Sequence, residues 1–173
     1  MNTVNDDRQN LAIQNELEFM AVFAGTPEAS PDVWEIVSPE DFYSPAMGKC
    51  YSHLMNLHER NGGFIAEDML NYVRENGGEE ALQAVKTAVM SVITYSVQGA
   101  VSLARKIKQY SIWRQAVKAA QDISFTTPET VEEVLETSLQ ALSGLAMENN
   151  AETMHPIQEM LVDFVNQKHS NRT

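Results

Sequence analysis

The residues of this 173-residue chain that could do chemistry are one cysteine and four histidines. Cys50 and His53 lie three positions apart in a segment with a helical pattern, so both could reach one metal ion. No second ligand pair follows at the spacing of a zinc site. His155 and His169 lie far along the sequence, and a lone cysteine with scattered histidines is not the signature of a catalytic nucleophile. We therefore expect no metal, no cofactor and no catalytic residue.

Nucleotide hydrolysis is not expected either. A phosphate-binding loop reads G-x-x-x-x-G-K-[ST], whereas here Gly48-Lys49 is followed by Cys50, and Tyr43 stands where the first glycine would be. The hydrolase patterns H-E-x-x-H and G-x-S-x-G do not occur. The acidic pair Glu79-Glu80 opens a helical segment, where negative charge suits the helix dipole. The sequence thus predicts a protein that is not an enzyme.

The elements that would position these residues are all helical by pattern. Apolar residues recur at helical spacing and no alternating strand pattern is found, so the expected class is all-α. Asn61-Gly62-Gly63 and Asn76-Gly77-Gly78 are strong helix stops, and Ser44-Pro45 is a strong start. Expected helices, in chain order, are 8–24, a short one opening at Ser30-Pro31 and running through Trp34 and Val37, 45–60, 66–76 and 79–93.

Residues 95–123 form the segment around which the chain is organised. Val97, Val101 and Ala104 make one apolar stripe, with Ala100 and Ile107 beside them. The stripe then shifts by about two residues, or roughly 200° of helix rotation. It resumes as Ile112, Trp113, Ala116, Val117, Ala120 and Ile123. One helix, or two meeting near Gln109–Ser111, is therefore expected to pack first in one module and then in another.

The remaining sequence predicts a hairpin and a last helix. Thr130 and Glu133 form a capping box, and a stripe of Val131, Val134, Leu135, Leu139 and Leu142 follows. A short loop to the preceding helix predicts an antiparallel helical hairpin. Residues 155–169 form an amphipathic helix whose apolar side has only the hairpin or another molecule to cover it. The expected organisation is a small globular helical domain (1–108), a helical hairpin (109–147), and a linker with a C-terminal helix (148–173).

The charge distribution argues against nucleic acid as a direct partner. The formal charge is −12. Residues 1–100 carry five Lys/Arg against fifteen Asp/Glu, a balance of −10, and carboxylates repel phosphates. A single cysteine, a polar start without an apolar signal segment, and no run long enough to cross a bilayer predict a cytoplasmic protein with no membrane contact.

One basic cluster stands apart from this acidic background. Arg105, Lys106, Lys108, Arg114 and Lys118 fall in a stretch without any acid between Glu80 and Asp122. The cluster is either a solvated helix face or a patch that meets an acidic partner or a neighbouring subunit.

The order of these elements resembles the N-terminal domain and linker helix of DnaB-family replicative DNA helicases. The likeness is carried by Ser38-Pro39-Glu40-Asp41-Phe42-Tyr43 before a helix, Leu57-His58-Glu59-Arg60-Asn61-Gly62 at its end, and Tyr95 with Ala104-Arg105-Lys106-Ile107 leading into the hairpin. Pro156-Ile157 and Met160-Leu161 resemble the linker helix. The first-helix phrase Ile13-Gln14-Asn15-Glu16-Leu17 diverges from the family, and no ATPase domain follows within this sequence. This divergence suggests a phage or mobile-element member.

The resemblance implies a non-catalytic role in DNA replication. Family domains pair through their hairpins, assemble as a trimer of dimers into the collar of the hexamer, and contact primase or the helicase loader. It implies that the partners are a second copy, the helicase ATPase domain, and primase or loader. The alternative is a free-standing phage-type adapter or inhibitor that mimics the domain and binds a host helicase, loader or primase. The residues expected to bind partners are Ile112, Trp113, Ala116, Val117, Ala120, Val134, Leu135, Leu139, Leu142, Ile157, Met160, Leu161 and Phe164.

Overall fold

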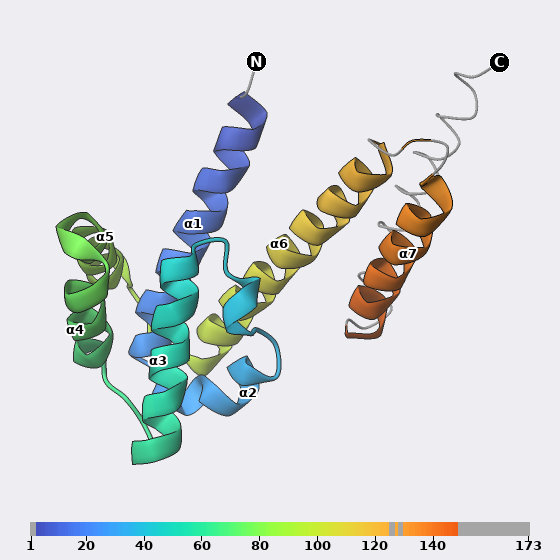
Figure 1. Ribbon diagram of the computed structural model, residues 1–173. Coiled ribbons are helices and arrows are strands. Elements are labelled where there is room, and N and C mark those ends of the chain that lie inside the picture. The colour runs from blue at the N-terminus through green and yellow to red at the C-terminus, as the bar shows by residue number, and fades with distance from the viewer. Residues whose placement is uncertain (1–2, 125–126, 128–129, 149–173) are drawn as a thin grey trace. The chain divides into compact units, whose positions relative to one another are not determined.

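The computed structural model describes residues 3–124, 127 and 130–148, and throughout these residues the chain is helical without strands (Figure 1). The expected all-α class is confirmed. In chain order the elements are α1 Thr3–Ala24, the 3₁₀ helix η1 Pro27–Ala29, α2 Ser30–Trp34, the 3₁₀ helix η2 Pro39–Asp41, α3 Pro45–Asn61, α4 Ala66–Asn76, α5 Gly78–Ser91, α6 Val97–Ser124 and α7 Val131–Glu148. None of these helices is long and apolar enough to cross a membrane.

The chain divides into two compact units, Met1–Ser111 and Ile112–Thr173. We call them the head unit and the hairpin unit. The helix α6 contributes residues to both. The boundaries predicted at residues 108 and 147 stay predictions.

Local sequence sets the limits of α3. The Ser44 hydroxyl accepts a hydrogen bond from the backbone N–H of Met47 at 3.4 Å, and Pro45 takes the first helical position. At the other end Gly62 has a φ of 75°, a left-handed conformation that favours glycine, and its N–H donates to the carbonyl of His58 at 2.8 Å. A serine–proline start and a glycine stop therefore fix this helix, close to the predicted 45–60.

Aromatic rings fill the centre of the head unit. Phe19 stacks on Phe23 with ring centroids 5.3 Å apart, and Phe23 lies 5.0 Å from Phe64. Phe42 lies 5.2 Å from Tyr51, whose hydroxyl donates to the backbone carbonyl of Val37 at 3.1 Å. The rings come from α1, α3 and the segments that flank α3, so the cluster joins elements distant in sequence. From α6, Ala100, Val101, Leu103, Ala104 and Ile107 complete the same core.

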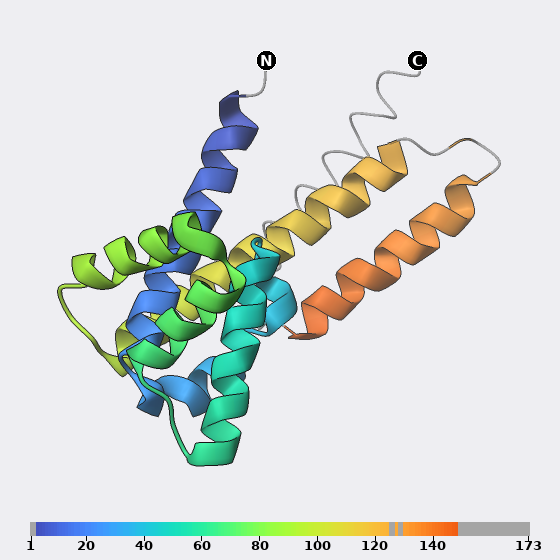
Figure 2. The ribbon, with the colours of Figure 1, turned by 60° about the vertical axis from the view of Figure 1, so that its left-hand side comes forward.

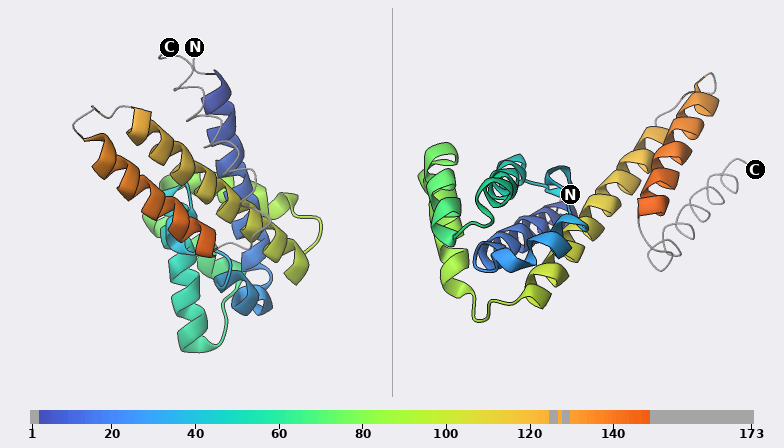
Figure 3. Two further views of the ribbon diagram at one scale, coloured as in Figure 1. Left: turned by 90° about the vertical axis from the view of Figure 1, so that its right-hand side faces the viewer. Right: turned by 90° about the horizontal axis from the view of Figure 1, so that it is seen from below.

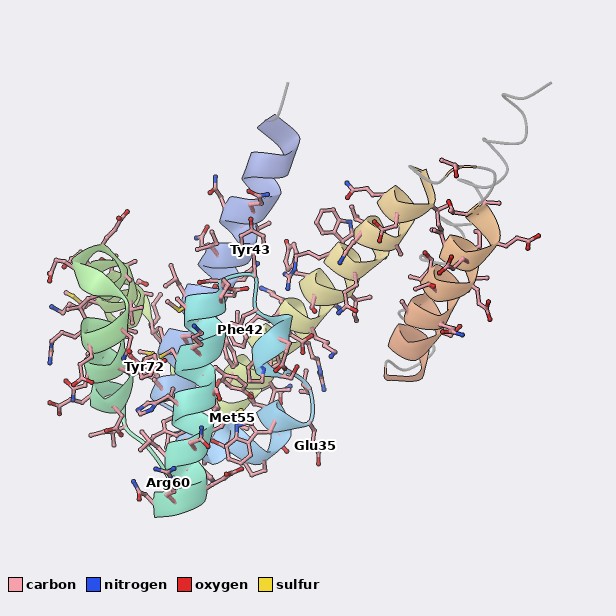
Figure 4. All side chains as sticks on the ribbon, viewed as in Figure 1. Glu35, Phe42, Tyr43, Met55, Arg60 and Tyr72 are labelled. Carbon is pink, nitrogen blue, oxygen red and sulfur yellow. The ribbon has the colours of Figure 1, made fainter. Side chains whose placement is uncertain are left out.

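A buried polar network holds the entry to α3, where Phe42 and Tyr43 are labelled in Figure 4. The carboxylate of Asp41 accepts from the backbone N–H of Ser38 at 2.9 Å and pairs with the Lys108 ammonium at 3.1 Å. Glu16 on α1, which is buried, accepts from the backbone N–H groups of Tyr43 and Ser44. Buried carboxylates are stable only when their oxygens are satisfied in this way. The network ties α1 and α6 to the turn before α3.

Four helix limits differ from the sequence predictions. The helix α1 begins at Thr3, five residues earlier than predicted. The cap of α2 is Ala29, because the Ser30 hydroxyl donates instead to the carbonyl of Pro27 at 2.7 Å, and α2 ends at Trp34. The helix α5 ends at Ser91 rather than residue 93. For residues 95–123 the sequence allowed one helix or two, and the structure shows one continuous helix, α6.

In the hairpin unit, α7 runs alongside α6 in the opposite direction (Figures 2 and 3). Ile112, Ala116 and Ala119 of α6 are buried in one cluster with Leu142 of α7. Their spacing of four and three residues places the α6 members on a single helix face. The interior is therefore narrow and built largely from small side chains.

Candidate interaction surfaces

The histidines and the cysteine of the described residues occupy packed positions. No group of three His, Cys, Asp or Glu side chains there could hold a metal ion. Cys50 is fully buried, and burial raises the pKa of its thiol to about 12, so the reactive thiolate does not form near neutral pH. His53 stacks on Tyr72 at 4.6 Å, and His58 meets the indole of Trp34 edge-on at 4.9 Å. The described residues offer two surface grooves as candidate sites.

The predicted partner-binding residues of the hairpin separate into three groups by burial. Ile112, Ala116 and Leu142 lie in the hairpin interior, where they hold α6 against α7. Leu139 is 59% exposed. Half-buried positions are Trp113, Val117, Ala120, Val134 and Leu135. The predicted Ile157, Met160, Leu161 and Phe164 lie outside the described residues. Sequence reasoning missed Ala119, which is buried, because it followed a wider stripe through Ala120.

The exposed side of α7 forms a shallow groove. It is lined by Glu132, Leu135, Glu136, Leu139, Gln140, Ser143 and Gly144. These positions recur every three to four residues, so they share one face of the helix. Leu135 and Leu139 supply its apolar centre and two glutamates supply its charge. An apolar centre between acidic groups is a surface that another helix could cover.

A second groove lies in the head unit between α1 and α5, which contact each other. Its apolar lining includes Leu17, Val22, Ala84 and Ala88, and it continues onto the loop after α5 through Val92 and Ile93. Glu18 lines the same groove, and Glu79 and Glu80 line its extension along α5. Gln14, Thr87, Ser91 and Thr94 also line the groove, so its lining mixes apolar, uncharged polar and acidic side chains.

The last turn of α5 and the loop that follows it carry the most exposed large apolar side chains of the described head unit. Met90 is 87% exposed and Ile93 is 98% exposed. Sequence reasoning placed Ile93 at the end of a helix with an apolar face, because periodicity does not tell an exposed apolar residue from a buried one. Tyr95 anchors the loop: its ring covers Gly25, where a β-carbon would overlap it, and its hydroxyl lies 3.3 Å from the carbonyl of Val89.

The basic cluster on α6 is not one uniform patch. Arg105, Lys106 and Lys118 are exposed, whereas Arg114 is half-buried and Lys108 pairs with Asp41. One of its five cations is thus part of the head-unit framework.

Comparison with known proteins agrees with this architecture. No family model matches the sequence, and no curated protein matches it significantly. Among solved structures, it is similar to the crystal structure of the N-terminal domain of DnaB helicase from Mycobacterium tuberculosis. The TM-score is 0.60 at 19% identity, over 76% of this chain and 96% of the other. The chain contains a DnaB N-terminal-like domain. The expected family resemblance is thereby confirmed at the level of fold.

The motif that carries the resemblance has a structural explanation in this DnaB-like domain. In Pro39-Glu40-Asp41-Phe42-Tyr43, the proline opens η2 and the aspartate joins Ser38 to Lys108. Phe42 enters the aromatic cluster, and the N–H of Tyr43 is bound by Glu16. Every assigned role concerns packing or backbone hydrogen bonding. The motif therefore supports the framework of the head unit.

Proposed function

We propose that this chain is the oligomerisation and partner-recruitment domain of a replicative DNA helicase. In this proposal two copies pair through their hairpin units, three pairs complete the collar of a hexameric ring, and the head unit recruits primase or the helicase loader. The domain itself is non-catalytic, and the ATPase domain of the helicase supplies the motor. The DnaB-like fold supports the proposal, and the exposed face of α7 carries it.

The leucines of α7 differ in whether the hairpin itself buries them. Its interior holds Leu142 and three α6 side chains, two of them alanines. Leu139 then remains 59% exposed on the other side of α7, with Leu135 half-buried beside it. Burying a leucine side chain contributes about 1.5–3 kcal/mol relative to exposure. A symmetric dimer uses the same surface of both copies, so one interface would bury Leu139 in each of them. A second hairpin is therefore a suitable cover for this face.

The test is to measure the mass of the full chain in solution across a range of concentrations. We expect a monomer–dimer equilibrium, and we expect Leu139→Asp to remain monomeric throughout, because pairing would bury an unpaired carboxylate. Light scattering coupled to gel filtration gives the mass.

The matched control is Ala141→Asp. Ala141 is also exposed on α7 but does not line the groove. This variant should dimerise as the unchanged chain does. Equal dimerisation of Leu139→Asp and the unchanged chain would show that copies pair through another surface.

For recruitment we assign the groove between α1 and α5. Its apolar lining residues, together with the acidic side chains of Glu18, Glu79 and Glu80, suit an amphipathic helix that carries Lys or Arg. Ile93→Asp should weaken capture of the cognate primase or loader by tenfold or more, since each 1.4 kcal/mol of lost binding is about tenfold. The control is Ile65→Asp, which changes another exposed isoleucine outside the groove. Identical capture by both variants would exclude this groove.

A further inference from the structure

We propose that the groove on α7 is a docking site for residues 155–169 of the same chain, which cover Leu135 and Leu139 and compete there with a second copy. The docking itself is argued from the surface of α7. Its consequence for assembly rests on the proposed function, because that function assigns the same face to pairing.

The first argument is the length of the connection. The helix α7 ends at Glu148, and the amphipathic segment begins at His155, leaving residues 149–154 as a connector of helix–helix hairpin length. If the segment is helical and runs back along α7, positions equally distant from the turn lie at one level. Phe164 then lies level with Leu139, since each is nine residues from its end of the turn.

The second argument is charge. In the same register Lys168 lies level with Leu135, between the groove glutamates Glu132 and Glu136. The opposite direction would place Lys168 away from both. Attraction between opposite charges therefore favours the antiparallel register that the short connector also imposes.

The cations that each occupant would bring to the groove favour this segment over a second copy. The sequence of α7 contains no Lys or Arg, so α7 of a second copy brings further glutamates and no cation to the groove. The segment brings Lys168 together with an apolar side that includes Met160, Leu161 and Phe164. It is also tethered, so its effective concentration at the groove does not fall on dilution. A second copy must therefore displace it.

Disulfide trapping in the full chain tests the docking directly. Ser143 lines the groove and is level with Met160. Ser143→Cys/Met160→Cys should form a disulfide within one chain under mild oxidation. The matched pair Ser143→Cys/Glu159→Cys lies at almost the same level but uses the polar side of the segment. It should react at least about tenfold more slowly, because a disulfide requires Cα atoms within roughly 7 Å. The natural Cys50 is buried and does not interfere.

Non-reducing gels distinguish the products, because a chain with an internal disulfide migrates as a monomer, whereas two chains joined by a disulfide migrate as a dimer. Equal rates for the two pairs, or disulfides formed only between chains, would overturn the docking. The first would mean that the segment does not present its apolar side to α7, and the second that the groove is filled by another copy.

The competition is tested by undocking the segment. Met160→Asp/Phe164→Asp in the full chain should tighten dimerisation about tenfold or more, since a competing state that is dominant reduces the apparent affinity by its population. Lys168→Glu should tighten it by a smaller factor of about two to five, the effect of one exposed ion pair. Sedimentation equilibrium measures both. Unchanged or weakened dimerisation would overturn the competition.

The two proposals fail separately. If Ser143→Cys/Met160→Cys rapidly forms the internal disulfide and no variant forms dimers, the docking is supported and pairing through α7 is refuted. If dimers form and depend on Leu139 while no internal disulfide forms in Ser143→Cys/Met160→Cys, pairing is supported and the docking is overturned.

Discussion

The head unit and the hairpin unit differ in how much apolar surface each encloses. The head unit surrounds a cluster of large rings from Phe19, Phe23, Phe42, Tyr51 and Phe64. Among the described residues of the hairpin unit, the buried apolar cluster consists of one isoleucine, two alanines and one leucine, while Leu139 is exposed. Since burial free energy follows the apolar area removed from water, the head unit can be stable by itself. The hairpin gains from every additional helix that covers it.

The largest effect should come from the ring cluster. Phe23→Ala removes a fully buried ring that contacts Phe19, Tyr51 and Phe64, and should lower the free energy of unfolding by about 3–5 kcal/mol. Urea unfolding followed by circular dichroism measures the change. In the hairpin, Leu142→Ala is the counterpart, with a cost that should depend on protein concentration if assembly stabilises that unit. A concentration-dependent cost for Phe23→Ala would contradict the distinction between the units.

Alkaline pH should act on the head unit specifically. Burial raises the pKa of Cys50 from 9.0 to about 12, and burial together with the charge of Asp41 raises the pKa of Tyr51 above its ordinary value of 10.0. The unfolded chain therefore loses these protons first. Stability is fully present below pH 9 and falls as the pH rises toward 12, by up to about 1.4 kcal/mol per pH unit and per group.

Denaturant midpoints measured between pH 8 and 11 test this dependence. In Cys50→Ala the decline between pH 9 and 10 should disappear, while the decline above pH 10 due to Tyr51 remains. Identical pH profiles for the two proteins would show that the Cys50 thiol is not protected by the fold.

A tight backbone approach within the head unit gives a smaller effect. A β-carbon at Gly48 would overlap the carbonyl oxygen of Pro39, so Gly48→Ala should cost about 1–3 kcal/mol as η2 is pushed away from α3. Gly63→Ala is the control, because nothing lies within 4 Å of the added carbon. Thermal unfolding compares the two variants, and equal losses would argue against the close contact.

The smallest effect should come from the exposed side of α7. In Met160→Asp/Phe164→Asp, where the docked segment no longer covers α7, Leu139→Asp should change the stability of the monomer by no more than about 0.5 kcal/mol, the range of ordinary surface substitutions, while it removes dimers. Unfolding at concentrations where the protein is monomeric measures this. A loss comparable with that of Phe23→Ala would mean that Leu139 supports the fold of its own chain.

The sequence predicted the helix limits best, because residues close to each limit determine where a helix begins and ends. The helices α3 and α4 begin and end within one residue of their predicted limits, because proline, serine and glycine act on the backbone within a few residues. Contacts between distant residues had no such signal. Lys108 meets Asp41 across 67 residues of sequence, and Lys108 had been grouped with surface cations. The burial of a single side chain could not be predicted from its sequence neighbours either. Ala119 and Ala120 are adjacent, yet Ala119 is buried in the hairpin cluster and Ala120 is half-buried.

The anchoring of Tyr95 on Gly25 has an entropic consequence for the loop that carries Ile93. A free loop of this length loses conformational entropy when a partner immobilises it, by about 1–2 kcal/mol for each residue fixed. Here the Tyr95 ring covers Gly25 and its hydroxyl lies near the carbonyl of Val89, so both ends of the loop are held before any partner arrives. Ile93 is thus held in a preorganised position, and in the proposed recruitment of a partner more of the burial energy of its side chain would be retained as binding affinity.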